Sequence, residues 1–187
     1  MIVWQAKHCS APLSQPTLPR FLLALASLAI AGNALATASD EVMVGGQLRE
    51  ARMFSVSGPP RMLSSFRGKP LIINVWASWC GPCRQEMNSL QQLSKIDLRK
   101  QFNVIGISID DDAIAATEFV NKAELTFDNF VDHKLGLETM LGANTIPLTI
   151  LVDGNGHVLA RIRGSHNWIS PASIALVQKT LGIQISR

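Results

Sequence analysis

The sequence predicts an α/β fold in which helices cover a central β-sheet. Residues 71–77 and 104–109 are nearly continuous apolar runs, which is typical of strands buried on both faces of a sheet. Segments with apolar residues at helical spacing follow these runs, and a hairpin pattern comes near the C-terminus. The order strand, helix, strand, helices, hairpin, helix contains no internal repeat and no low-complexity linker. It therefore predicts a single domain of this class.

Composition narrows the class of protein. The chain has 187 residues, of which 47% are hydrophobic and 17% charged, and its net charge is +3. This length suits one compact domain with a short appendage, or two very small domains. The hydrophobic content excludes a disordered chain, and the mild charge excludes a nucleic-acid-binding footprint. Three cysteines are too few for a fold stapled by disulfides.

Residues 1–36 have the pattern of a secretory signal peptide. Lys7 and Arg20 precede the uncharged apolar run FLLALASLAIA at residues 21–31, and the small-x-small pattern ALA at residues 34–36 offers a cleavage site. The apolar segment is shorter than the roughly 20 residues that a spanning helix needs. An uncleaved N-terminal anchor remains the alternative. Export would place the rest of the chain where disulfides form and persist.

After the leader, residues 37–52 are expected to be a loose entry segment, because Gly45 and Gly46 interrupt any early element. The folded domain is expected over residues 53–187. Its first element is predicted as a short edge strand at residues 53–56, which turn-forming residues end. The buried strand at residues 71–77 follows.

A helix is predicted over residues 83–100, where the apolar positions are Met87, Leu90, Leu93 and Leu98. The buried strand at residues 104–109 comes next. The acidic triplet at residues 110–112 opens a second helix that runs to about Ala123. We interpret these carboxylates as helix caps and dipole partners, not as a metal site. The remaining predicted elements are an extended segment at 125–131, a short helix at 133–141, a hairpin at 148–152 and 157–163, and a closing helix at 170–181.

Cys80 and Cys83 are predicted to form a redox-active dithiol. The buried strand leads to Cys80 at the start of a helix, and two intervening residues place Cys83 one turn further in. The helix N-terminus offers unpaired N–H groups and a positive dipole, which can lower a thiol pKa from ~8.5 toward ~7. Pro82 suits the first helical turn because that turn leaves its N–H groups unpaired. We assign Cys80 as the attacking thiol and Cys83 as the resolving thiol.

Other roles of a CxxC motif fit less well. Half of a zinc site is disfavoured, because no second cysteine pair follows the leader and the histidines show no ligand spacing. A haem attachment site would need histidine where Arg84 stands. A loop this short also gains too little from closure to act chiefly as a structural staple.

The segment VWASWCGPC at residues 75–83 resembles the active-site segment of thioredoxin-fold proteins. Its surroundings narrow the resemblance to the exported TlpA/ResA-type thiol-disulfide oxidoreductases of the thioredoxin-like superfamily. These surroundings are GKP at residues 68–70, CRQEM at 83–87, IP at 146–147 and the strand that ends VD at 152–153. The similarity runs from about residue 54 to residue 164. It implies a thioredoxin-like fold with a central mixed sheet, and no cofactor besides the Cys80–Cys83 disulfide.

The resemblance also implies roles for individual residues. Pro147 would be a cis-proline that faces the dithiol, and Ile146 would offer backbone groups to an extended substrate segment. Trp79 and Pro82 would belong to the same substrate surface. Glu86 matches a glutamate of these proteins and is the candidate for proton transfer during resolution. A solvated helix glutamate is the alternative.

Three positions bear on how the protein is specialised. Asn74 stands where thioredoxins carry a buried aspartate, and an amide cannot accept a proton from Cys83. Asn88 replaces a proline that kinks the helix in many relatives. Leu148 follows Pro147, where proteins of cytochrome c maturation often have an acidic residue, and this weakens the cytochrome interpretation.

We therefore expect a periplasmic thiol-disulfide oxidoreductase that reduces disulfides of protein substrates. Cytochrome c maturation or a similar assembly pathway is the expected setting, with a membrane electron donor and a membrane tether through residues 21–36 if the leader is kept. No nucleic-acid partner and no metal is expected. The alternatives are a disulfide oxidase or isomerase, and a chaperone or metallochaperone that binds Cu(I) through both cysteines.

Overall fold

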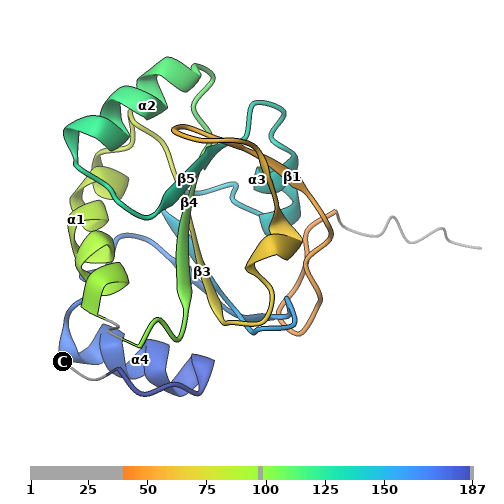
Figure 1. Cartoon of the computed structure of the whole chain (residues 1–187), viewed down its shortest axis with the longest axis vertical. Coiled ribbons are helices and arrows are strands. Elements are labelled where there is room, and N and C mark those ends of the chain that lie inside the picture. Colours follow the sequence, from red (N-terminus) through yellow and green to blue (C-terminus); the bar gives the residue numbers. More distant parts are fainter. Residues whose placement is uncertain (1–39, 97–98, 186–187) are drawn as a thin grey trace, which may run out of the picture. The chain divides into compact units, whose positions relative to one another are not determined.

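The computed structural model describes residues 40–96 and 99–185, whose strands form one seven-stranded mixed sheet (Figure 1). The strand order is β2-β1-β5-β4-β3-β6-β7. The parallel centre consists of β3 (Leu71–Trp76), β4 (Asn103–Ser108) and β5 (Asp128–Val131). The antiparallel flanks are β1 (Arg52–Ser55), β2 (Arg61–Met62), β6 (Leu148–Val152) and β7 (Val158–Arg163). The predicted α/β class with a central mixed sheet is confirmed. The predicted signal peptide, residues 1–36, lies outside the described residues.

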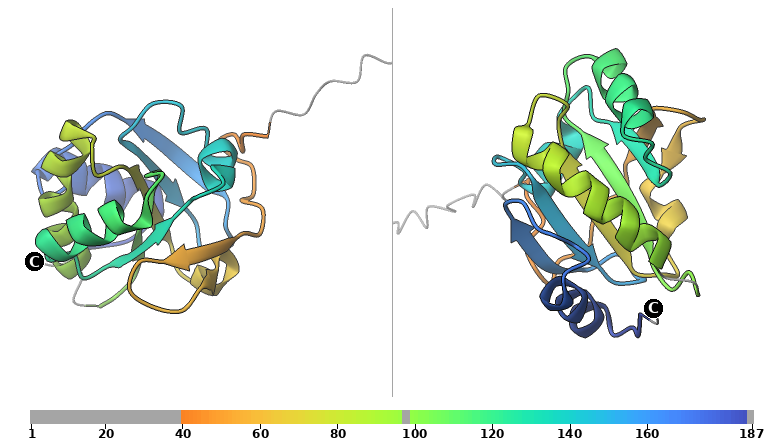
Figure 2. Two further views of the ribbon diagram at one scale, coloured as in Figure 1. Left: turned by 90° about the horizontal axis from the view of Figure 1, so that it is seen from above. Right: turned by 90° about the vertical axis from the view of Figure 1, so that its left-hand side faces the viewer.

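Helices cover both faces of the sheet (Figure 2). The helices α1 (Gly81–Ile96), α2 (Ala113–Lys122) and α4 (Pro171–Leu181) pack on one face, and α3 (Gly136–Leu141) and the 3-10 helix η1 (Leu63–Phe66) pack on the other. Side chains of β3 alternate between these faces, so Ile72 and Trp76 join one core and Leu71, Ile73 and Val75 join the other. Asn74 lies on the face of α1.

Several element boundaries differ from the prediction. The expected edge strand at residues 53–56 is correct as a strand, but β2 pairs outside β1, so β1 is not the edge. The helix predicted to end at Lys100 is described only as far as Ile96. Lys100 is not helical, because its φ is 49°. Leu98 lies outside the described residues. The helix α3 begins later than predicted because Leu135 has a φ of 53°.

The helix ends follow the predicted capping chemistry. The Oγ of Ser170 accepts from the N–H of Ser173, Pro171 opens α4, and Gly182 ends it at a φ of 66°. The side chain of Asp112 caps α2 by accepting from the N–H of Ile114. Of the predicted acidic caps, Asp112 fills that role, and Asp110 has a different one, described below.

The structure corrects the prediction of a loose entry segment. Residues 40–48, which we name the N-terminal strap, are held by hydrogen bonds from Val42 N to Met140 O and from Leu48 N to Gly156 O, both 2.8 Å. Val42 and Leu48 are buried in the core on the α3 face. Arg161 on β7 binds the carbonyls of Val42 and Leu141 and pairs with Glu41 at 2.7 Å. Buried apolar side chains thus hold this segment in place, although its glycines had predicted only an interruption of secondary structure.

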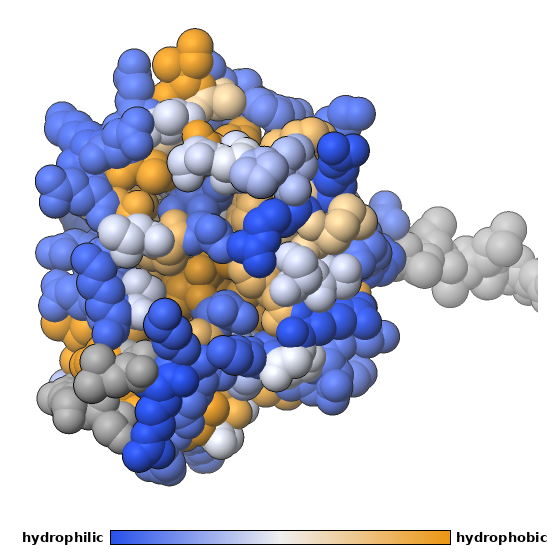
Figure 3. Space-filling view, viewed as in Figure 1, coloured by the Kyte–Doolittle hydropathy of each residue, from blue (hydrophilic) through white to orange (hydrophobic). Residues whose placement is uncertain are grey.

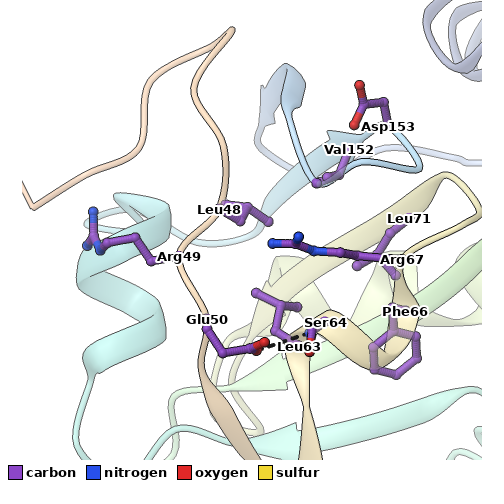
Figure 4. A pocket seen from close by; sticks show the side chains of 11 residues that line it. Leu48, Arg49, Glu50, Leu63, Ser64, Phe66, Arg67, Leu71, Val152 and Asp153 are labelled. Carbon is purple, nitrogen blue, oxygen red and sulfur yellow. Dashed lines mark hydrogen bonds between the residues drawn. The ribbon is translucent and has the colours of Figure 1, made fainter.

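Beneath the strap lies a small cavity of about 20 Å³, which the side chain of Arg67 crosses (Figure 4). Glu50 lines it and accepts from the N–H of Ser64 at 3.1 Å. This volume holds about one water molecule, which is too little for a substrate. The face seen in Figure 3 exposes apolar side chains in its hollowed centre and at parts of its edge, and hydrophilic residues cover most of the rest.

Candidate active site

The two cysteines of the CGPC segment lie where the connection from β3 enters α1. Cys80 directly precedes the first residue of α1, and a disulfide of 2.03 Å joins it to Cys83 in the first turn. Cys80 is 6% exposed, whereas Cys83 is fully buried. The N–H of Cys83 donates to the Sγ of Cys80 over 3.2 Å. A helix N-terminus whose N–H points at this sulfur favours a negative charge on Cys80 once the pair is reduced.

The loop between β3 and Cys80 is fixed by a carboxylate that the sequence analysis had placed among helix caps. Asp110 is buried at the end of β4 and accepts from Ser78 N at 3.1 and 3.0 Å and from Ser78 Oγ at 2.8 Å. Ser108 Oγ donates to the same carboxylate over 2.6 Å. The parallel pairing of β3 and β4 brings these residues together. Asp110 therefore positions the backbone that leads into the dithiol.

Glu86 is buried one turn after Cys83, at 2% exposure, so it is not a solvated helix glutamate. Its Oε1 accepts from Asn74 Nδ2 over 2.7 Å, and its Oε2 accepts from His166 N over 3.0 Å and from Trp168 Nε1 over 3.3 Å. Burial raises the pKa of Glu86, and these hydrogen bonds and the charge of His166 oppose that rise in part. The result is a carboxyl group whose proton is held to higher pH than usual.

Sequence reasoning missed the residues that surround Glu86. His166 and Trp168 come from the connection between β7 and α4, about 80 positions along the chain. Ser89 ties the same connection to α1, because its Oγ donates to Glu86 O and accepts from Trp168 N. No motif spacing links these positions. The i, i+3 relation between Glu86 and Ser89 was the one local signal.

The Ile146–Pro147 peptide is cis, as the resemblance implied. Leu148 pairs with Val75 in the antiparallel register of β6 and β3, so Pro147 lies at the sheet end where β3 leads to the dithiol. Pro147 is buried and its carbonyl accepts from the N–H of Gly164 at 2.9 Å. Within the described residues, the backbone N–H and C=O of Ile146 have no hydrogen-bond partner. They are free to pair with an extended segment of another chain.

The two tryptophans of the motif lie in opposite environments. Trp76 is fully buried and packs on Phe119 of α2, with ring centroids 5.1 Å apart. Trp79, next to Cys80, is 67% exposed, and Pro82 is also exposed. Trp79 and Pro82 therefore offer apolar surface beside the reactive sulfur.

The described ranges contain neither a cluster of metal ligands nor a helix that could span a membrane. No three His, Cys, Asp or Glu side chains gather there as a metal site. No helix within residues 40–96 or 99–185 is long and apolar enough to cross a membrane.

Known proteins resemble this chain over most of its length. Residues 43–176 match the family model described as Redoxin. The chain is 33% identical over 142 residues to the thiol:disulfide interchange protein DsbE of Vibrio cholerae, which covers 71% of this chain and 73% of that protein. It is 26% identical over 129 residues to the thiol-disulfide oxidoreductase ResA of Geobacillus kaustophilus, covering 69% and 74%.

A solved structure shares the architecture. It is a DsbE-type thiol:disulfide interchange protein from Chlorobium tepidum, with a TM-score of 0.67 and 27% identity. The match covers 74% of this chain and 96% of the other. All three relatives carry names of thiol-disulfide exchange proteins.

Proposed function

The chain belongs to the Redoxin family as a thiol-disulfide oxidoreductase of the TlpA/ResA type, and we propose that it reduces disulfides of protein substrates outside the cytoplasm. One observation carries the proposal. The Cys80–Cys83 pair sits at a helix N-terminus, where Cys80 is 6% exposed and Cys83 is fully buried. The Gly-Pro dipeptide between them resembles that of reducing thioredoxins, and this sets the direction we propose.

The proposed reaction is a pair of thiolate displacements. The thiolate of Cys80 attacks one sulfur of the substrate disulfide, forms a mixed disulfide and expels the other substrate sulfur as a thiolate. The thiolate of Cys83 then attacks the Sγ of Cys80 and releases the second substrate thiol. Two electrons pass to the substrate, and the protein is left with the Cys80–Cys83 disulfide. An external dithiol donor must restore the reduced form.

Resolution needs the proton of Cys83 to leave, and we assign its acceptor as Glu86. The carboxylate lies one turn further along α1 in the same buried layer. Its raised pKa brings it closer to that of a thiol, which favours proton exchange between the two groups. Asn74 cannot take this role because an amide does not titrate there.

We assign substrate binding to the surface around Cys80. Trp79 and Pro82 provide exposed apolar contact, and the unpaired backbone groups of Ile146 are placed for a strand-like pairing beside Pro147. The chemistry of this surface suits an extended polypeptide more than a small molecule.

The setting is proposed from the leader and from the family resemblance. A signal-peptide pattern at residues 1–36 supports export to the periplasm, and residues 21–36 serve as a membrane tether if the leader is retained. A membrane dithiol protein is the electron donor that we propose. Cytochrome c maturation or a similar assembly pathway would use such a reductase, although Leu148 departs from the acidic residue common in that group.

Two alternatives make different predictions. A disulfide oxidase would form the disulfides of a reduced protein, and an isomerase would rearrange those of a scrambled protein, faster than either reduces a native disulfide. A Cu(I) chaperone would retain the metal stoichiometrically on Cys80 and Cys83 and show no exchange turnover.

Turnover tests the proposed function. With dithiothreitol as electron source, the protein should accelerate reduction of the insulin disulfides, and Cys80→Ser should abolish the acceleration. Glu86→Gln should slow turnover while leaving the first attack by Cys80 intact. Copper retention without turnover would overturn the proposed function, and faster formation than reduction of substrate disulfides would overturn the proposed direction.

A further inference from the structure

An open groove runs along α1 away from the dithiol, between α1 and α2, which lie side by side in Figure 2. It has a volume of about 890 Å³. Ser78 and Gly81 line its near end, and these residues flank Trp79 and Cys80. A polypeptide whose cysteine is joined to Cys80 therefore reaches this groove along the protein surface.

The floor of the groove is apolar and preformed. Met87 of α1 is 1% exposed, and Phe119 of α2 packs on the buried ring of Trp76. Met87 belongs to the core beneath α1 and α2, and the half-buried Phe119 packs against that core, so the floor does not have to be built when a ligand arrives. An apolar side chain of a partner would be buried on this floor.

The walls of the groove carry an excess of positive charge. Arg84 projects from α1 and Lys122 from α2, both are exposed, and in the described structure the side chain of neither has a hydrogen-bond or ion-pair partner. Glu118 is the carboxylate in the lining, and it forms no ion pair with Lys122 one turn away. Two unpaired cations against one carboxylate favour an anionic occupant.

We propose that this groove docks an extended segment of the protein substrate that carries an acidic side chain next to an apolar one, beside the cysteine that Cys80 attacks. The acidic group pairs with Arg84 and Lys122, and the apolar group packs chiefly on the half-buried Phe119, because Met87 beneath it is 1% exposed. This inference rests on the proposed function and adds the class of substrate to it. The ion pairs form with the docked segment and not with the reacting sulfurs, so they contribute to substrate affinity, and their exposure keeps that contribution small.

Two synthetic disulfide-linked peptides test the proposal with the full chain and dithiothreitol as electron source. One carries Asp-Leu on both sides of its cysteine, and the other carries Asn-Leu at the same positions. Lys122→Ala should raise the KM for the acidic peptide about two- to fivefold, which is the range for exposed ion pairs, and leave its kcat unchanged. The KM for the neutral peptide should not change. Raised salt should remove the wild-type preference for the acidic peptide.

A matched control is available on the same helix pair. Lys95 is exposed near the end of α1 and does not line the groove, so Lys95→Ala should leave both KM values unchanged. Arg84→Ala should act like Lys122→Ala. The reduction potential of the Arg84→Ala variant is measured as well, because Arg84 adjoins Cys83 and its loss can also change the dithiol.

The outcomes separate this inference from the proposed function. If the wild-type protein reduces both peptides and Lys122→Ala changes their KM values equally or not at all, the groove proposal is wrong and the reductase stands. If the wild-type protein reduces neither peptide, both fail.

Discussion

Asn74 and Glu86 form a buried pair that fits either protonation state of the carboxyl group. The Nδ2 of Asn74 donates to Glu86 Oε1 over 2.7 Å and to Thr149 Oγ1 over 3.0 Å, while the Oδ1 of Asn74 has no partner in the described structure. If the amide turns over, Oδ1 faces both groups and accepts from a protonated Glu86 and from the Thr149 hydroxyl. The site can therefore hold or lose the proton without moving its backbone.

Glu86→Gln should alter how stability depends on pH. Burial raises the pKa of Glu86 from its ordinary value of 4.5, so in a window above that pH the folded protein keeps a proton that the unfolded chain has lost. The contribution of this group to the unfolding free energy then falls as pH rises through the window. Urea unfolding of the oxidised proteins between about pH 4 and pH 8 should show this decline in the wild type and not in Glu86→Gln. Parallel pH profiles would contradict the assignment.

Cys83→Ser should trap a substrate on Cys80. The variant can form the mixed disulfide but has no thiol to resolve it. Mass spectrometry after incubation with a disulfide substrate should find a covalent adduct at Cys80. The matched variant Cys80→Ser should form far less adduct, because Cys83 is fully buried. Equal adducts on both variants would refute the division of roles.

Asp110→Ala should destabilise the protein and loosen the approach to the dithiol. The substitution strands the N–H and hydroxyl of Ser78 and the hydroxyl of Ser108, and a stranded buried donor costs about 1–3 kcal/mol. We expect the unfolding free energy to fall by at least that amount and disulfide exchange to slow. The neighbouring Asp111 is exposed, so Asp111→Ala should stay within about 0.5 kcal/mol of wild type. Similar losses in both variants would remove the special role of Asp110.

Gly106→Ala should be destabilising because β4 has no room for a side chain there. A Cβ at this position would lie 2.0 Å from Asn129 Oδ1 and 2.8 Å from Trp76 Nε1. Forcing these buried groups apart should lower the unfolding free energy by about 1–3 kcal/mol. Gly136 has open space at its Cβ, so Gly136→Ala in α3 should be neutral or stabilising. Calorimetry or urea unfolding distinguishes the pair, and a neutral Gly106→Ala would show that the packing is looser than described.

Much of the fold could be predicted because its signals are local. The apolar runs of β3 and β4, the hairpin turn between β6 and β7, and the caps of α4 are each contained in a few neighbouring residues. The N-terminal strap was mispredicted because its two anchors, Val42 and Leu48, are too few to make a periodic pattern. Gly45, with a φ of 89°, makes a turn within the strap and does not interrupt it.

The residues of the site likewise divide into those with a local sequence signal and those that only the fold brings together. Cys80, Pro82 and Cys83 are adjacent in sequence, so their chemistry was predictable from spacing. The surroundings of Glu86 depend on the return of the chain after β7, which brings His166 and Trp168 onto α1. The role of Asp110 depends on the pairing of β3 with β4, and an acidic triplet before a helix gives no sign of it.

The reduction potential of the Cys80–Cys83 pair tests the central claim most directly. The full chain is equilibrated against dithiothreitol and glutathione buffers, and the fraction of free thiol is measured at each ratio. We predict one reversible two-electron couple, absent from Cys80→Ser, at a potential more negative than that of glutathione. A more oxidising potential would contradict the reductase direction, and the absence of any reversible couple would contradict the dithiol chemistry itself.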